Sequence, residues 1–168
     1  VAAPETGTAL EEDLKLLDGL RITELMYRSP KGSSYDYVEL TNVIDEALDL
    51  TGVRFSKGID FTFGALKLQP NERVVVAANQ TAFRSLYGSA PKIAGQYQGN
   101  LSDDGEKIVL QLPAPMEAAI LRFDYSSAWY PTTNGGGQSL AIRNATDPPV
   151  VWKEAAGWRS SDPTPGRP

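Results

Sequence analysis

The stretch from Phe123 to Ile142, which reads FDYSSAWYPTTNGGGQSLAI, constrains the fold of this chain more than any other segment. Phe123 and Tyr125 alternate with polar residues, as in a strand with one buried face. Pro131 cannot donate to a strand ladder, and the three glycines that follow it open a turn. The alternation then resumes at Leu140 and Ile142. This stretch predicts a strand, a corner and a second strand, which is architecture rather than chemistry.

The same period of two runs through most of the chain from Leu20 onward, with turn residues between the apolar runs. One helix interrupts the strands, because Asn79 is a suitable N-cap and Gly88 stands where a left-handed C-terminal stop belongs. This order predicts an all-β fold, an immunoglobulin-like β-sandwich with one short helix and without the disulfide that such domains often have. The predicted strands lie within residues 20–28, 36–43, 52–63 (two short strands), 72–79, 92–97, 106–112 and 119–125.

The first of these strands, LRITELMYR at residues 20–28, is irregular. Its apolar phase slips between Ile22 and Leu25. One extra residue inserted into a strand produces such a slip, and burial of the strand on both faces hides the alternation altogether. The sequence therefore predicts either a β-bulge or a strand that is buried on both faces.

Residues 1–19 differ in style from the strand region and are predicted to be a leader, either a linker or a short acidic helix. Thr8 and Glu11 have the spacing of a capping box. Leucines at three positions fall on one helical face: Leu10, Leu14 and Leu17. Two interpretations remain open, a helix that docks on an upstream partner and a helical lead-in that covers a sheet edge.

The domain itself is predicted to comprise residues 20–168. Its last part, residues 144–168, is rich in Pro, Ser, Thr and Asp, which predicts an irregular tail. Trp152 and Trp158 are its only large apolar groups, so we expect at least one of them to hold the tail against the domain. The chain starts at Val1 with no signal-peptide pattern, and we therefore expect it to be a piece of a longer protein.

Charge and residue content exclude several classes of function. The chain has 168 residues, which is enough for one domain with a full core. A net charge of −5 argues against nucleic-acid binding, because that affinity depends on Lys and Arg side chains that displace counterions. Without His or Cys there is no imidazole base, no thiol nucleophile and no imidazole or thiolate metal ligand. No apolar run is long enough to span a bilayer.

Eight ordered sequence blocks run from about Leu20 to Gly166: LRITELMYRSP, DYVELTN, DLTGVRFSKGIDFTF, LQPNERVVVAAN, FRSLYG, GNLSDDGEKIVL, FDYSSAWYPTTNGGGQSLAI and a terminal TPG. As a set, these blocks resemble the lamin tail domain as it occurs in bacterial proteins. The resemblance implies an immunoglobulin-like β-sandwich that serves as an accessory module for protein binding or structural positioning. It also implies partners among other protein domains, in the same polypeptide or outside it, and an extracellular or cell-envelope location. No coiled-coil heptads precede the domain, so filament assembly is not implied.

The acidic residues Asp103, Asp104 and Glu106 resemble an oxygen-ligand cluster for Ca²⁺, which needs six or more oxygens. Three side chains without the EF-hand spacing are too few. Asp followed by Gly is what a tight hairpin turn requires, so a turn is the favoured interpretation. We therefore assign no metal, no cofactor and no catalytic residue, and we expect the chain to fold without metal.

Glu24 and Glu39 lie in the first two blocks, and paired carboxylates are the one acid–base device that a chain without His can still use. If the two strands form a hairpin, these glutamates lie near each other, and like charges directly opposite are destabilising. Three arrangements resolve this: the side chains face opposite sides, they bond backbone or Arg groups, or they share a cation or a proton. The alternative function, a carbohydrate-active or metal-dependent hydrolytic domain, depends on these acidic residues.

Trp129, Tyr130 and Asn134 complete the candidate binding residues, together with Glu24 and Glu39. Aromatic rings at a surface can form a platform for a carbohydrate or peptide ligand, although most rings in a sandwich of this size pack at corners. The Thr-Thr-Asn-Gly-Gly-Gly loop could form an anion-binding nest, but it lacks the Lys and the following helix of a phosphate-binding loop. A tightly turned structural corner is the favoured interpretation.

Overall fold

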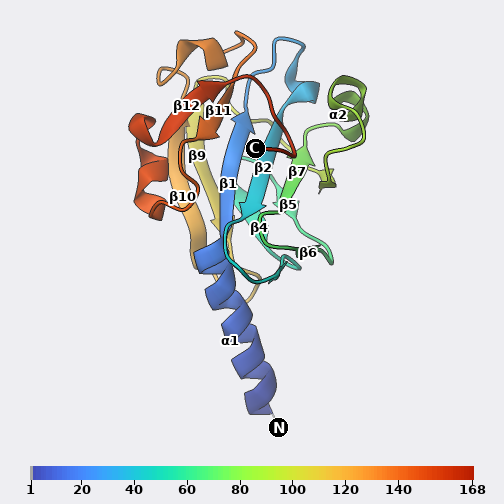
Figure 1. Ribbon diagram of the computed structural model, residues 1–168, viewed down its shortest axis with the longest axis vertical. Coiled ribbons are helices and arrows are strands. Elements are labelled where there is room, and N and C mark those ends of the chain that lie inside the picture. Colours follow the sequence, from blue (N-terminus) through green and yellow to red (C-terminus); the bar gives the residue numbers. More distant parts are fainter. Residues whose placement is uncertain (1) are drawn as a thin grey trace.

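The computed structural model describes residues 2–168, and it describes side chains from residue 9 onward. A two-layered head carries helix α1, which projects away from it along the long axis of the molecule (Figure 1). The helices are α1 (Ala2–Gly19) and α2 (Gln80–Tyr87). Four short 3₁₀ segments are η1 (Ser33–Tyr35), η2 (Pro131–Thr133), η3 (Pro149–Lys153) and η4 (Ala155–Gly157). The strands are β1 (Leu20–Met26), β2 (Tyr37–Asn42), β3 (Leu48–Asp49), β4 (Arg54–Lys57), β5 (Phe61–Thr62), β6 (Lys67–Leu68), β7 (Arg73–Ala77), β8 (Ile93–Gln96), β9 (Gly105–Gln111), β10 (Ala119–Ser126), β11 (Ser139–Ile142) and β12 (Trp158–Ser161).

Two large sheets form the sandwich. One has six strands in the order β12-β11-β1-β2-β7-β8, the other has four in the order β10-β9-β4-β5, and β3 pairs with β6 apart from both. All pairs are antiparallel except β7 with β8, which are parallel because α2 provides the crossover between them. The main core lies between the two large sheets, and Ile22, Leu110 and Phe123 are among its buried side chains. The predicted β-sandwich is confirmed.

Strand β1 combines both arrangements that its sequence predicts. Its register against β2 shifts between Ile22 and Glu24, which is a β-bulge, and every residue of the strand is buried. The inner face of the sheet packs on the main core. On the outer face, Met26, Tyr37 and Phe83 belong to a second apolar cluster with Val75 and Ala77. Both faces are covered, so the usual alternation of apolar and polar residues is lost.

The predicted helix and corner are confirmed in detail. The Asn79 side chain accepts the Ala82 N–H at 2.9 Å, and Gly88 ends α2 at φ 80°. At the corner, Gly135 and Gly137 have φ values of 81° and 97°, which L side chains rarely adopt. Gly136 has no positive φ, but a Cβ there would lie 2.6 Å from the Thr132 carbonyl oxygen.

Residues 144–168 are more ordered than predicted. Both tryptophans are fully buried, and the Trp152 indole donates to the Ile22 carbonyl at 2.8 Å. The Trp158 indole in turn donates to the Trp152 carbonyl at 3.0 Å. Trp158 also begins β12, which pairs with β11 and which the irregular-tail interpretation did not include. The sequence WRSS shows little alternation of apolar and polar residues, so it does not predict a strand. Burial of Trp158 holds this segment beside β11, where it forms β12.

Helix α1 corrects two details of the leader prediction. It begins at Ala2, so Thr8 lies within the helix and is not its N-cap. Leu16 is buried in the core and Leu17 packs against it, whereas Leu10 and Leu14 are 56% and 53% exposed. The last turns of α1 contact the sandwich, where Arg21 Nη1 of β1 donates to the Leu17 carbonyl at 2.9 Å. No helix among the described residues is long and apolar enough to cross a membrane.

Candidate functional site

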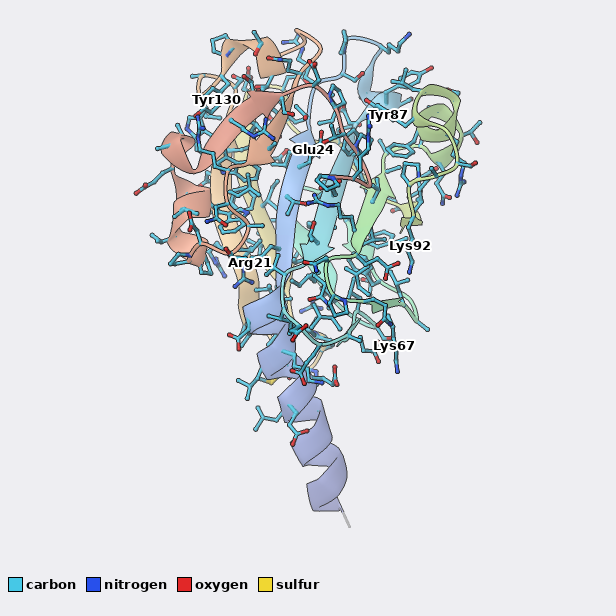
Figure 2. All side chains as sticks on the ribbon, viewed as in Figure 1. Arg21, Glu24, Lys67, Tyr87, Lys92 and Tyr130 are labelled. Carbon is cyan, nitrogen blue, oxygen red and sulfur yellow. The ribbon has the colours of Figure 1, made fainter. Side chains whose placement is uncertain are left out.

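Glu24 and Glu39 lie side by side on the outer face of the six-stranded sheet. They are cross-strand partners on β1 and β2, because the bulge after Ile22 turns Glu24 to the same face as Glu39. Their exposed fractions are 2% and 1%. Of the three predicted arrangements, the one with side chains on opposite faces is wrong. Figure 2 shows Glu24 on the central strands of the sheet, beneath the C-terminal segment.

Glu39 is held by donors from three directions. Its Oε1 accepts the Thr23 hydroxyl at 2.6 Å and Arg73 Nη1 at 2.8 Å, and its Oε2 accepts the Gly166 N–H at 2.8 Å. Burial raises the pKa of Glu39, and the nearby charge of Glu24 raises it further. The bonds from Thr23, Arg73 and Gly166 lower that pKa without cancelling the effect of burial.

The two carboxylate oxygens of Glu24 differ in their hydrogen bonding. Its Oε2 accepts three bonds, from the Tyr37 hydroxyl at 2.6 Å, the Ser139 hydroxyl at 2.5 Å and the Thr164 N–H at 3.1 Å. Its Oε1 is buried and has no hydrogen-bond partner among the described residues. Burial raises the pKa of Tyr37 well above its ordinary value, and the charge of Glu24 adds to this rise. The two glutamates therefore bond backbone, hydroxyl and Arg groups, which is one of the predicted arrangements.

The segment that covers the glutamates ends in a tight turn, Thr164–Arg167, which we call the C-terminal turn. The Arg167 N–H donates to the Thr164 carbonyl at 3.1 Å, and Gly166 has φ 82°. Pro at the second position and Gly with positive φ at the third define a type II β-turn. Pro165 is buried against the domain. Sequence reasoning placed TPG at the end of the domain but did not connect it to the glutamates, because they are more than 120 residues apart.

Trp129, Tyr130 and Asn134 lie at the corner and bond different partners. Both rings are half-buried and pack against the main core. The Tyr130 hydroxyl lies 2.8 Å from the Ala155 carbonyl and 2.7 Å from the Trp158 carbonyl, and it can donate its proton to either. The Asn134 side chain accepts Arg28 Nη1 at 2.8 Å. The Tyr130 hydroxyl thus bonds backbone carbonyls of the same domain. A ligand-binding role for these residues stays a prediction.

The acidic cluster at residues 103–106 has the geometry of a turn. Gly105 has φ 120°, and β9 begins there. Asp103 lies 3.6 Å from Arg28 Nε, whereas Glu106 Oε2 accepts the Ser102 N–H and the Tyr125 hydroxyl. In the part of the chain with described residues, no group of three or more acidic side chains could hold a metal ion.

A separate surface feature lies between α1 and the loop that follows β9. A cavity of about 570 Å³ is lined by residues of α1, by Asp49 and Thr51, and by residues 113–116. Leu10 on the helix and Met116 on the loop line it, and Met116 is 43% exposed. Its acidic side chains are Glu12, Asp13 and Asp49. Leu10 was visible in the sequence as part of a helical face, but its position in one cavity with Met116 was not. We call this feature the α1 groove.

A six-stranded and a four-stranded sheet with the main core between them define an immunoglobulin-like β-sandwich. The family model of the lamin tail domain matches residues 17–127, which is more than half of the chain, and the chain belongs to this family. The match begins in the last turn of α1. Comparison with curated proteins and with solved structures found no match to this chain.

Proposed function

We propose that this lamin tail domain is a non-catalytic module that binds or positions other protein domains, and that the α1 groove is its contact surface. The observation that carries the proposal is the gathering of exposed apolar side chains at this groove. Leu10 and Met116 line it, and Leu14 is exposed on the same helix. Exposed apolar groups that cluster beside a concave surface are typical of protein-binding sites.

The helix itself supports the same proposal. Its C-terminal turns contact the sandwich through Leu16, which is buried in the core, and through the bond from Arg21 to the Leu17 carbonyl. An isolated helix of this length is marginal in water, and most helical stability in proteins comes from packing of an apolar face. A partner that covers Leu10 in the groove would supply that packing to the exposed part of the helix.

The acidic lining of the groove indicates the chemistry of the partner. Glu12, Asp13 and Asp49 surround the apolar surface, and burial raises the pKa of Asp13. A second copy of the same acidic helix would bring like charges together. A partner segment with apolar residues and flanking Lys or Arg side chains fits better, because opposite charges steer association and favour the correct partner.

The non-catalytic part of the proposal is supported by how the candidate acids are used. The carboxylates of Glu24 and Glu39 bond to Thr23, Tyr37, Ser139, Arg73 and two backbone N–H groups. No observation favours a hydrolytic domain over a binding module. We further propose an extracellular or cell-envelope location, supported by the resemblance of the sequence blocks to lamin tail domains of bacterial proteins.

A basic amphipathic peptide tests the groove. The probe is a helical peptide of about 18 residues composed of Leu and Lys, titrated into the protein with fluorescence anisotropy as the readout. We expect the Leu10→Ser, Met116→Ser double variant to bind it about tenfold more weakly, because two apolar contacts in the groove are lost. Both side chains are exposed, so the fold should persist.

The matched control is Leu86→Ser on α2, which removes another exposed leucine, 39% exposed, away from the groove. This variant should bind the probe like the unmodified protein. Equal binding by all three proteins would contradict the proposed surface. A peptide with Glu in place of Lys should bind more weakly, and equal affinity would contradict the expected charge of the partner.

A further inference from the structure

The outer face of the six-stranded sheet already holds a peptide segment in a defined manner. The C-terminal turn crosses this face and places one backbone N–H on each of two buried carboxylates. Thr164 N donates to Glu24 Oε2 at 3.1 Å, and Gly166 N donates to Glu39 Oε2 at 2.8 Å. Figure 1 shows the chain running from β12 across the face toward β7. This surface is separate from the α1 groove.

The spacing of donors and acceptors explains why two glutamates are needed. Cross-strand partners place their Cβ atoms roughly 5 Å apart, and the N–H groups that reach them come from Thr164 and Gly166, the first and third residues of the turn. Two carboxylates on neighbouring strands can therefore accept alternate N–H groups of one segment. Hydrogen bonds to a charged acceptor are also stronger than neutral ones. The two glutamates would destabilise the hairpin if they were left unpaired, but here each accepts a backbone N–H from the C-terminal turn.

The geometry of the turn makes the site selective for Pro-Gly. Gly166 has φ 82°, and a Cβ added there would lie 2.9 Å from Pro91 Cβ and 3.0 Å from Pro91 Cα. Any other residue at this position meets both an unfavourable backbone conformation and a steric conflict. Pro165, buried beside it, presets the backbone for the second position of a type II turn.

The segment is only loosely enclosed, unlike the strands beneath it. A cavity of about 360 Å³ borders it, lined by Tyr87, Pro91 and four residues of the segment among others. A second cavity of about 480 Å³ lies next to Gly166 and Arg73. The segment is thus held mainly by its backbone bonds and by Pro165, in the way a short peptide occupies a groove.

We propose that Glu24 and Glu39 form a binding site for a peptide segment with a Pro-Gly type II turn, occupied here by the chain's own residues 163–167. The site accepts the same turn in trans when the internal segment is displaced. The ligand class is a segment with a Pro-Gly type II turn that offers the backbone N–H groups of its first and third turn residues. This inference goes beyond the proposed function, and loss of the α1 groove would not affect it.

The experiment uses the full chain with its own turn displaced. Gly166→Val should dislodge the turn, because it combines φ 82° with the contact to Pro91. The probe is a synthetic peptide of residues 161–168 with blocked ends, titrated calorimetrically. We expect this variant to bind the peptide at least about tenfold more tightly than the unmodified protein, whose internal segment competes at an effective concentration in the millimolar range.

Two controls define the recognition. A peptide with Val in place of its Gly should not bind, and adding Glu39→Gln to the Gly166→Val variant should weaken binding by about tenfold, because one acceptor loses its charge. Binding that is indifferent to both changes would overturn the proposal, as would a folded Gly166→Val variant that does not bind the peptide.

A second variant keeps the test decisive if Gly166→Val does not fold. A flexible Gly/Ser linker of about 12 residues inserted between Ser161 and Asp162 keeps the turn sequence but lowers its effective concentration. The amide protons of Thr164 and Gly166 should be protected from exchange in this variant, and excess peptide should remove that protection. Protection that persists at millimolar peptide would show a fixed part of the fold and would overturn the proposal.

Discussion

The buried carboxyl groups of Glu39 and Asp36 have different hydrogen-bond partners. Glu39 pairs with the guanidinium of Arg73, whose Nη1 lies at 2.8 Å. Removing one partner of a buried ion pair destabilises a protein by more than the intact pair stabilises it. Asp36, by contrast, accepts only the Ser29 N–H at 2.8 Å within the hairpin and is almost completely buried. These two residues differ in how their charge is compensated, and this difference leads to a prediction about pH.

We predict that Asp36 makes the domain less stable as the pH rises. The pKa of Asp36 is raised to about 7, mainly by burial; the Ser29 N–H lowers this pKa, and the charge of Asp103 raises it. The ordinary value is 3.8. Because the folded pKa is higher than the unfolded one, the stabilising contribution is fully present below about pH 4 and is lost as the pH rises towards 7.

The variant Asp36→Asn tests this, because an amide keeps the acceptor for Ser29 and removes the charge. The free energy of unfolding should fall by up to about 1.4 kcal/mol per pH unit from this one group between pH 4 and 7. The slope of Asp36→Asn should be smaller by this amount in denaturant titrations. Glu39, whose pKa is also raised, leaves a residual slope in both proteins. Parallel curves for the two proteins would contradict the prediction.

At the scale of elements, the β1 bulge and the Phe123–Ile142 corner decide where side chains point. The bulge moves Glu24 onto the face of Glu39, and the corner brings Thr133 to the Tyr27 hydroxyl at 2.6 Å. Gly136 lies at the closest backbone approach of the corner, beside the Thr132 carbonyl. Its role is steric, since it is the flanking glycines that have positive φ.

We therefore predict that Gly136→Val lowers the free energy of unfolding by roughly 1–3 kcal/mol, because the corner must shift to admit the side chain. The matched control is Gly64→Val, since a Cβ at Gly64 meets nothing within 4 Å. That control should stay within about 0.5 kcal/mol of the unmodified protein. Denaturant melts of the two variants provide the comparison, and equal stability would show that the corner tolerates a side chain.

At the scale of the whole molecule, an apolar core between two sheets supplies the stability. The core includes Trp152 and Trp158 from the last part of the chain, so the sandwich is closed only when residues 149–161 are in place. No acidic cluster that could hold a metal was found among the described residues. The fold is thus expected to form from packing alone.

We predict that a chelator leaves the β signal in circular dichroism unchanged and shifts the melting temperature by less than about 2 °C, which corresponds to about 0.5–1 kcal/mol at most for a domain of this size. Excess Ca²⁺ should have equally little effect. A Ca²⁺-dependent rise in melting temperature that Asp103→Asn abolishes would instead identify the cluster at residues 103–106 as a metal site.

Most of the architecture could be read from local patterns. Alternation identified the longer strands, and Asn79 with Gly88 identified α2, because caps and periods of two are properties of neighbouring residues. The order of the sequence blocks indicates the lamin tail family. The slip between Ile22 and Leu25 predicted a bulge or burial on both faces, and β1 has both.

What the sequence could not determine depends on residues that are far apart along the chain. The leucines of helix α1 were visible in the sequence, but only the sandwich decides that Leu16 and Leu17 pack on the core and that Leu10 stays exposed. The glutamate pair was visible as two acidic residues, but its partners Thr164 and Gly166 come from the opposite end of the chain. The sequence by itself thus determined the elements and the family, whose signals are short-range. Only the tertiary structure decided which groups meet, because a buried carboxylate is defined by its distant donors and not by its neighbours in sequence.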